Sequence, residues 1–188
     1  MLRDDPDIPG EARLGHRPGV LSRPIVLLAP GETARGEELV RTADVAFTDA
    51  DAAHPGFRGK VGATVLPFDG KYGAFTDADA RGQFMAGLGF VQPPGIAERD
   101  DDTSFYVEIA PEQARLLDGD VLVALADEGS ARRQVDSDPV LRRIPVVARG
   151  DVVVPDADTR GAMTYNSVLS APYALERLVP QLAGKLAG

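Results

Sequence analysis

Hydrophobic and polar positions along the chain follow two different periods, which predict helices and buried strands in alternation. From Gly31 to Ala53, apolar residues recur three and four positions apart with charged residues between them, the spacing of an amphipathic helix. We expect Thr33 to cap this helix and His54-Pro55-Gly56 to end it. Two continuous apolar runs, Lys60–Pro67 and above all Asp120–Leu125, are typical of strands inside a parallel sheet.

Shorter segments continue the alternation. A second helix carries Phe84, Met85 and Leu88, with Asp77 or Asp79 as its cap and Gly89 as its left-handed end. The remaining helices and strands are expected at Phe105–Ile109 (strand), after Pro111 (helix), at Gly129–Val135 (helix), at Pro145–Ala148 and Val152–Val154 (strands joined by a tight turn, Arg149-Gly150-Asp151) and at Ser170–Leu186 (helix). Loops are expected at Phe68–Thr76, Gln92–Thr103 and Arg160–Ser167. Together these elements predict an α/β fold, a three-layer α/β/α sandwich around a mostly parallel central sheet.

The first 30 residues lack such a pattern. They mix acidic residues, arginines and prolines, and we expect them to be poorly ordered. A secretory signal needs an apolar stretch of about 7–15 residues, and a membrane span needs about 20. The longest early apolar run, Ile25–Ala29, is shorter than either, so we expect this segment to carry neither an export signal nor an anchor.

Composition narrows the classes of partner. The chain has 188 residues, enough for one α/β domain, and a formal net charge of −9. Binding to nucleic acid or to an anionic membrane requires a basic face, so neither is expected as a partner. The sequence has no cysteine, which excludes disulfides and thiolate metal sites and leaves the compartment open.

No constellation for catalysis or metal binding stands out. The only histidines, His16 and His54, lie in the tail and before a proline, and there is no GxSxG motif. The acidic run Asp100-Asp101-Asp102 lacks EF-hand spacing and is expected to be a solvated loop. The glycines around Lys60 lie within or before a strand, where a phosphate loop would not be. We therefore expect no catalytic residue, no metal site and no cofactor.

Two expected loops combine aromatic residues with polar donors. Phe68–Phe75 follows a strand, and in open α/β sheets ligands bind at such carboxyl ends. The second is Arg160–Ser167. Tyrosine, lysine and arginine suit a large, oxygen-rich ligand. The alternative is that Tyr72 and Tyr165 are ordinary half-buried aromatic residues.

Five blocks of sequence carry a resemblance to a known family. They resemble, in order and spacing, the interlobe helix and C-terminal lobe of the type III (single-helix-hinge) solute-binding proteins that deliver ferric siderophores to ABC importers. The blocks are Ala34–Lys60, which ends in His-Pro-x-Phe-x-Gly-Lys, then Phe68–Pro94, Phe105–Leu125, Asp138–Val154 and Gly161–Leu186.

This resemblance implies a non-catalytic binding lobe for a ferric siderophore, which holds the iron itself. It implies a linking helix at 31–55 and a ligand-binding lobe at 56–188. By position, it also implies that five residues line the ligand cleft and that Glu128 contacts the permease. The five are Lys71, Tyr72, Arg160, Met163 and Tyr165. Members of the family are extracytoplasmic, as periplasmic proteins or cell-surface lipoproteins.

The departures from the family keep other readings open. The sequence lacks the family's N-terminal lobe, signal sequence and lipidation cysteine, and it has no tryptophan. Ala110 replaces a frequent capping serine or threonine. One alternative is a truncated remnant or interaction module, which dimerises through the face left exposed or pairs with a separate N-terminal lobe. Another is a cobalamin- or haem-binding relative with the same fold.

Overall fold

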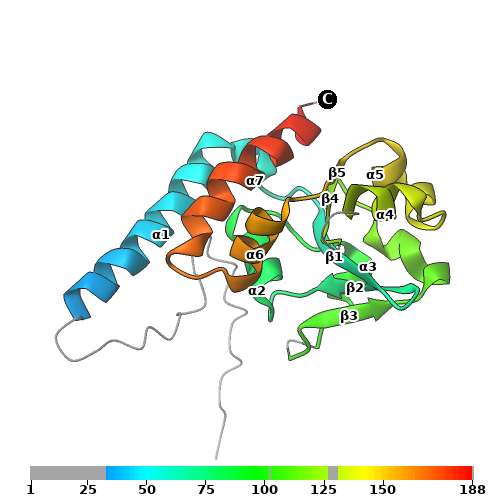
Figure 1. Cartoon of the computed structure of the whole chain (residues 1–188), viewed down its shortest axis with the longest axis horizontal. Helices are drawn as coiled ribbons and strands as arrows, with labels where there is room; N and C mark the ends of the chain where they lie inside the picture. The colour runs from blue at the N-terminus through cyan, green and yellow to red at the C-terminus, as the bar shows by residue number, and fades with distance from the viewer. Residues whose placement is uncertain (1–32, 102, 127–130, 188) are drawn as a thin grey trace, which may run out of the picture.

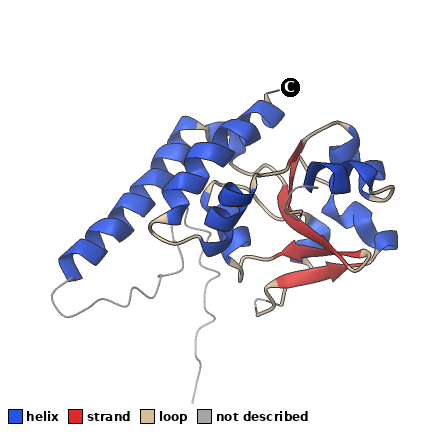
Figure 2. Ribbon diagram, in the orientation of Figure 1, coloured by secondary structure: helices blue, strands red, loops and turns tan. Residues whose placement is uncertain are grey.

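A five-stranded sheet lies between two layers of helices in the computed structural model of this chain (Figure 1, Figure 2). Residues 33–101, 103–126 and 131–187 are described. Each face of the sheet has its own hydrophobic core, one under each helical layer. The three-layer α/β/α sandwich expected from the sequence is therefore confirmed.

The strand order is β3-β2-β1-β4-β5. The strands are β1 (Gly62–Phe68), β2 (Lys71–Phe75), β3 (Tyr106–Ile109), β4 (Val121–Ala124) and β5 (Val152–Val153). β4 pairs in parallel with β1 and with β5, whereas β2 pairs antiparallel with β1 and with β3. It follows that β2 runs against the other four, so the sheet is mostly parallel. Every side chain of β4 is buried, as expected for a strand covered on both faces.

The hairpin β1–β2 replaces an expected loop. Asp69 and Gly70 both have positive φ, 46° and 72°, and they form a two-residue turn whose twist matches that of the flanking strands. Most of Phe68–Thr76 is therefore strand, and the prediction of a loop there was wrong. The Asp-Gly pair was the available signal, but Gly73 interrupts the apolar alternation that would have marked the second strand.

Three further expectations were wrong for local reasons. Pro145–Ala148 is the short helix α5 rather than a strand, because Pro145 sits at the first helical position. Gly150, with φ 85°, then turns the chain into β5, so Arg149-Gly150-Asp151 is not a hairpin turn. The expected loop Arg160–Ser167 is mostly helix α6 (Ala157–Tyr165), capped by Asp156, which accepts a hydrogen bond from the Thr159 N–H at 2.8 Å.

One helical layer packs on β1, β4 and β5. It contains α1 (Thr33–Ala53), α2 (Ala80–Gly87), α6 and α7 (Ser170–Leu186). The expected helices at Gly31–Ala53 and Ser170–Leu186 are confirmed over the described residues. Asp79 is the cap of α2, and Gly89 follows that helix with φ 87°, as expected. Whether α1 acts as a hinge helix stays a prediction, and residues 1–30 lie outside the described residues.

The opposite layer is built from short helices. They are α3 (Pro94–Ala97), η2 (Pro111–Leu117), α4 (Ala131–Ser137), η3 (Leu141–Arg143) and α5, with η1 (Pro55–Phe57) linking α1 to β1. The helix expected after Pro111 is a 3₁₀ helix, and Ala110 before it offers no side-chain cap. Within the described part of the chain, no helix is both long and apolar enough to cross a membrane.

Helix α2 approaches the end of β2 very closely at Gly82. A Cβ atom at this position would lie 1.9 Å from the carbonyl oxygen of Thr76. The nearest atoms, the carbonyl oxygen and carbon of Thr76, belong to the backbone and cannot rotate away as a side chain could. We expect Gly82→Ala to lower the free energy of unfolding by at least about 2 kcal/mol, measured by chemical denaturation.

The matched control is Gly184→Ala in α7, where an added Cβ would meet nothing within 4 Å. Alanine has the higher helix propensity, so this variant should gain about 0.5–1 kcal/mol. Equal effects of the two substitutions would contradict the packing argument.

Candidate functional site

The sheet face beneath α1, α2, α6 and α7 is only partly covered. These helices pack over β1, β4 and β5, and the outer strands β2 and β3 extend beyond them. The uncovered area forms a groove of about 360 Å³, which we call the aromatic groove. It is lined by Leu66, Phe68, Gly73, Phe75, Asp79, Arg81, Phe105 and Tyr106.

Three aromatic rings of the groove pack edge to face across neighbouring strands. The ring of Tyr106 on β3 lies 6.0 Å from that of Phe68 on β1 and 6.4 Å from that of Phe75 on β2. Gly73, on the strand between Phe68 and Tyr106, makes this possible. A Cβ there would lie 3.2 Å from the Phe68 ring and 3.3 Å from the Tyr106 ring. The missing side chain therefore lets two rings close over the backbone and form an apolar wall.

A cation borders this wall at the start of α2. The guanidinium carbon of Arg81 lies 3.5 Å from the centre of the Phe75 ring, a cation–π contact. Its Nε and Nη2 donate to the two carboxylate oxygens of Asp79 at 2.6 and 2.8 Å. Asp79 also accepts from the Arg81 backbone N–H at 2.9 Å, as the cap of α2. Arg81 is thus held against the Phe75 ring by one residue that is both cap and counter-ion.

The rim of the groove is held by Thr76. Its backbone N–H donates to the carbonyl of Phe105 at 3.1 Å, and its hydroxyl donates to the carbonyl of Ser104 at 2.5 Å. The preceding loop is ordered by Asp101, whose carboxylate accepts from the backbone N–H and hydroxyl groups of Thr103 and Ser104, and these bonds lower its pKa to about 2. Phe105 is thereby presented to solvent with 64% of its surface exposed.

Of the acidic run in this loop, Asp101 matches the expected solvated turn, Asp100 is half-buried, and Asp102 lies outside the described residues. Asp101 is exposed and serves the hydrogen bonds described above. Among the described residues, no group of three or more His, Cys, Asp or Glu side chains is placed to hold a metal ion.

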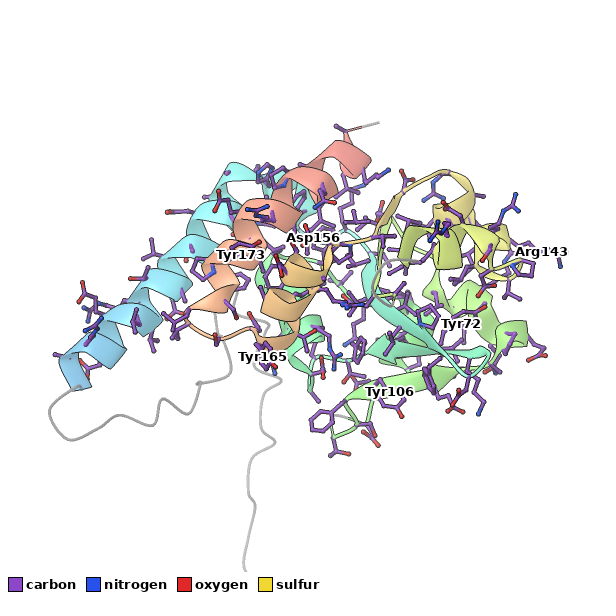
Figure 3. All side chains as sticks on the ribbon, in the orientation of Figure 1. Tyr72, Tyr106, Arg143, Asp156, Tyr165 and Tyr173 are labelled. Atoms are coloured by element: carbon purple, nitrogen blue, oxygen red, sulfur yellow. The ribbon has the colours of Figure 1, made fainter. Side chains whose placement is uncertain are left out.

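Two of the expected ligand-binding residues lie near the groove. Lys71, at the β1–β2 turn, pairs with Glu108 of β3 at 2.6 Å, and this hydrogen bond raises the pKa of Lys71. Tyr165, 80% exposed, ends α6 beside α2. The next residue, Asn166, donates from Nδ2 to the carbonyl of Ala80 at 3.2 Å. Figure 3 shows Tyr106 and Tyr165 along the same lower margin of the molecule.

Two other expected residues are core residues in this structure. Tyr72 is 3% exposed, on the sheet face opposite the groove, and its hydroxyl donates to Asp138 Oδ2 at 2.8 Å. Met163 is 0% exposed and packs in the core beneath α6. Both side chains point into the cores and neither lines the groove, so a binding role for Tyr72 and Met163 stays a prediction.

Arg160 and Glu128 complete the expected set. Arg160 is half-buried on α6, and its Nη1 donates to the carbonyl of Ala126, just past the carboxyl end of β4. Glu128 lies outside the described residues. The binding role of Lys71, Arg160 and Tyr165 stays a prediction.

The candidate segment Phe68–Phe75 contributes Phe68, Gly73 and Phe75 to the groove, but the sequence reasoning missed the other side of it. Arg81, Phe105 and Tyr106 were read only as parts of a helix and a strand. The available signal was in Tyr106–Ile109, whose sequence Tyr-Val-Glu-Ile alternates polar and apolar side chains. This alternation marks a strand with one open face, and the structure shows the same alternation of exposed and buried positions. Two adjacent aromatic residues at the start of such a strand indicate an exposed aromatic surface.

A second hollow, of about 670 Å³, lies on the opposite face between α4, α5 and β5. Among the described residues that line it, none is aromatic. The smaller aromatic groove is therefore the better candidate for binding an organic ligand.

The chain was compared with known proteins. No family model matches the sequence, and no curated protein matches it. Solved structures do match. A periplasmic solute binding protein from Mycobacterium smegmatis has 26% identity and a TM-score of 0.68 over 81% of this chain and 51% of its own. PiaA from Streptococcus pneumoniae, in complex with ferrichrome, has 24% identity and a TM-score of 0.66 over 82% and 54%. FhuD2 from Staphylococcus aureus, with bound ferrioxamine B, has 17% identity and a TM-score of 0.62 over 83% and 62%.

These comparisons confirm the resemblance to solute-binding proteins for iron uptake at the level of fold. The similar structures are binding proteins and not enzymes. The chain spans about half the length of the first two and somewhat more of the third.

The structural role of Tyr72 can be tested by pH. Burial, then the hydrogen bond to Asp138, raises its pKa well above the ordinary value of 10.0. The folded state therefore favours the protonated phenol. Its contribution to the free energy of unfolding is complete below pH 10 and is lost as the pH rises further. We expect the unfolding free energy of the wild type to fall above pH 10, and that of Tyr72→Phe to fall less. At neutral pH the variant should lose about 1 kcal/mol. Identical alkaline slopes in denaturant titrations would contradict this role.

Proposed function

We propose that this chain forms the ligand-binding lobe of a solute-binding protein that delivers a ferric siderophore to an ABC importer. The aromatic groove would be one wall of its binding site. The observation that carries the proposal is the groove itself: exposed aromatic rings on the uncovered part of the sheet, in a fold shared with siderophore-binding proteins.

The chemistry of the wall suits such a ligand. A ferric siderophore binds its iron with its own oxygen atoms, so the protein needs to supply contact area and hydrogen bonds rather than metal ligands. Phe105 and Tyr106 offer exposed ring surface, and the Tyr106 hydroxyl and the Arg81 guanidinium offer donors at the edge. Tyr165 and Lys71, on either side, would extend the contact.

The groove is an open half-site. Its volume of about 360 Å³ is at the lower end of the range of roughly 300–1,000 Å³ for ligand pockets, and such pockets bury most of their ligand. An open wall cannot do so. We therefore expect a second lobe, like the remainder of the similar structures, to close over the groove, and we expect the described lobe alone to bind weakly.

A second candidate is an interaction module. Four large side chains are exposed on the groove side and at the α6–α7 connection: Phe105, Tyr106, Tyr165 and Leu169. A surface of this kind can also pair with another copy of the chain or with a separate lobe. Glu128 stays our candidate for the permease contact, and an extracytoplasmic location is supported by the periplasmic protein among the similar structures.

The function is tested by calorimetric titration of the chain with ferric siderophores, with light scattering to give its mass. Saturable binding to a monomer is expected. Tyr106→Ala should weaken it by roughly tenfold, the scale of a single aromatic anchor. The control is Val45→Ala, which shortens an exposed apolar side chain on α1, away from the groove, and should leave binding unchanged.

Other outcomes would redirect the proposal. A stable dimer without ligand binding would favour the interaction module. Binding of cobalamin or haem, recognised by its absorption spectrum, would favour a relative with the same fold and a different ligand. Equal losses in the two variants would show that the groove is not the binding surface.

A further inference from the structure

The charges around the aromatic groove occur as closed pairs. Arg81 is bound to Asp79 through both nitrogens, and Lys71 is bound to Glu108. Near Lys71 lies a further carboxylate, Asp69, and Asp101 stands in the loop that leads to Phe105. Of the described residues, the two cations that border the groove, Arg81 and Lys71, are therefore each neutralised by a carboxylate partner, and Asp69 and Asp101 add negative charge nearby.

The two pairs differ in how strongly solvent screens them. The side chains of Asp79 and Arg81 are 11% and 21% exposed, whereas those of Lys71 and Glu108 are about half exposed. A charge that solvent screens less acts more strongly on a bound ligand. The Arg81 guanidinium also lies over the Phe75 ring, inside the groove lining. Its charge is thus the one that would act most strongly on a ligand in the groove.

We propose that Asp79 sets the charge preference of the groove by masking Arg81, so that the groove accepts an electrically neutral ferric trihydroxamate and rejects a trianionic ferric tris-catecholate. This rests on the proposed function. Three hydroxamates, each with one negative charge, cancel the charge of Fe(III), whereas three catecholates leave three negative charges. A trianion would need a cation on the wall whose charge is not already compensated. Asp79 compensates the charge of Arg81, so this cation does not meet that need.

The role of Asp79 can be tested because its negative charge can be removed while its function as the cap of α2 is kept. Its oxygen caps α2 through the Arg81 N–H, and asparagine and serine are also good helix caps. Asp79→Asn and Asp79→Ser therefore keep the cap and leave the Arg81 guanidinium without its carboxylate. Asp49→Asn, at an exposed position on α1, removes the same formal charge far from the groove and is the matched control.

The test uses the full chain, labelled with ¹⁵N, and two gallium(III) complexes, a neutral trihydroxamate and a trianionic tris-catecholate. Gallium has the charge of Fe(III) and is diamagnetic, so weak binding can be followed by the amide shifts of Gly73, Phe105 and Tyr106. In the wild type, the neutral complex should shift these amides at lower concentration than the trianion. In Asp79→Asn and Asp79→Ser, the affinity for the trianion relative to the neutral complex should rise roughly three- to tenfold. The control should keep the wild-type ratio.

The outcomes separate the two proposals. If the wild type binds the trianion as well as the neutral complex, or if both Asp79 variants keep the wild-type ratio, the role of Asp79 is wrong and the groove remains a siderophore wall. If neither complex shifts the groove amides in any variant, the groove is not a siderophore wall, and the proposed function fails together with this inference. An equal rise in the Asp49→Asn control would show a general charge effect and would also overturn the role of Asp79.

Discussion

The contact between Gly82 and the carbonyl of Thr76 is the constraint on which the site depends. Helix α2 reaches the end of β2 only because position 82 has no side chain. This approach brings the first turn of α2, with Asp79 and Arg81, over the ring of Phe75. Thr76 in turn binds Ser104 and Phe105, so the same short stretch of backbone places the cation, the ring and the rim of the groove. A helix held slightly farther away would separate these groups.

Unequal coverage of the sheet creates the site. β4 is buried on both faces and joins β1 and β5 in a parallel arrangement that helices cover from both sides. β2 and β3 lie on the other side of β1, where the layer of α1, α2, α6 and α7 ends. β3 is therefore packed on one face and open on the other, as its alternating exposed and buried positions show. On β2 the groove-side residues Gly73 and Phe75 are buried, and Phe75 packs against the exposed ring of Tyr106. The parallel strands β1, β4 and β5 form the covered centre of the sheet, and the antiparallel pairing of β2 with β1 and β3 forms the surface of the groove.

The shared fold and the groove chemistry support different parts of the functional argument. The likeness to solved solute-binding proteins gives the fold, since identities of 17–26% carry little information about individual contacts. The contacts come from this chain. Its wall combines ring surface with cations that are already paired. This distinguishes the groove from an anion site, which would present unpaired arginines.

The sequence by itself determined the class of fold, the long helices and the central strands, because each depends on a pattern that is local and strong. Helices α1 and α7 follow the 3.6-residue period, and β4 is a continuous apolar run. Caps are equally local: Asp79 is one of the two caps that the sequence offered for α2, and Gly89 follows that helix as expected. The sequence also carried the order of blocks that resembles the solute-binding proteins.

Only the tertiary structure decided which polar and aromatic side chains face the site. Tyr72 and Tyr106 are both tyrosines on neighbouring strands, yet one lies in a core and the other lines the groove. Their difference depends on strand register and on where a helical layer ends, and a shift of one residue would exchange the two faces. The pairing of Arg81 with Phe75 depends likewise on the close approach at Gly82, for which no local pattern exists. Long-range packing, which the order of residues does not display, made the difference.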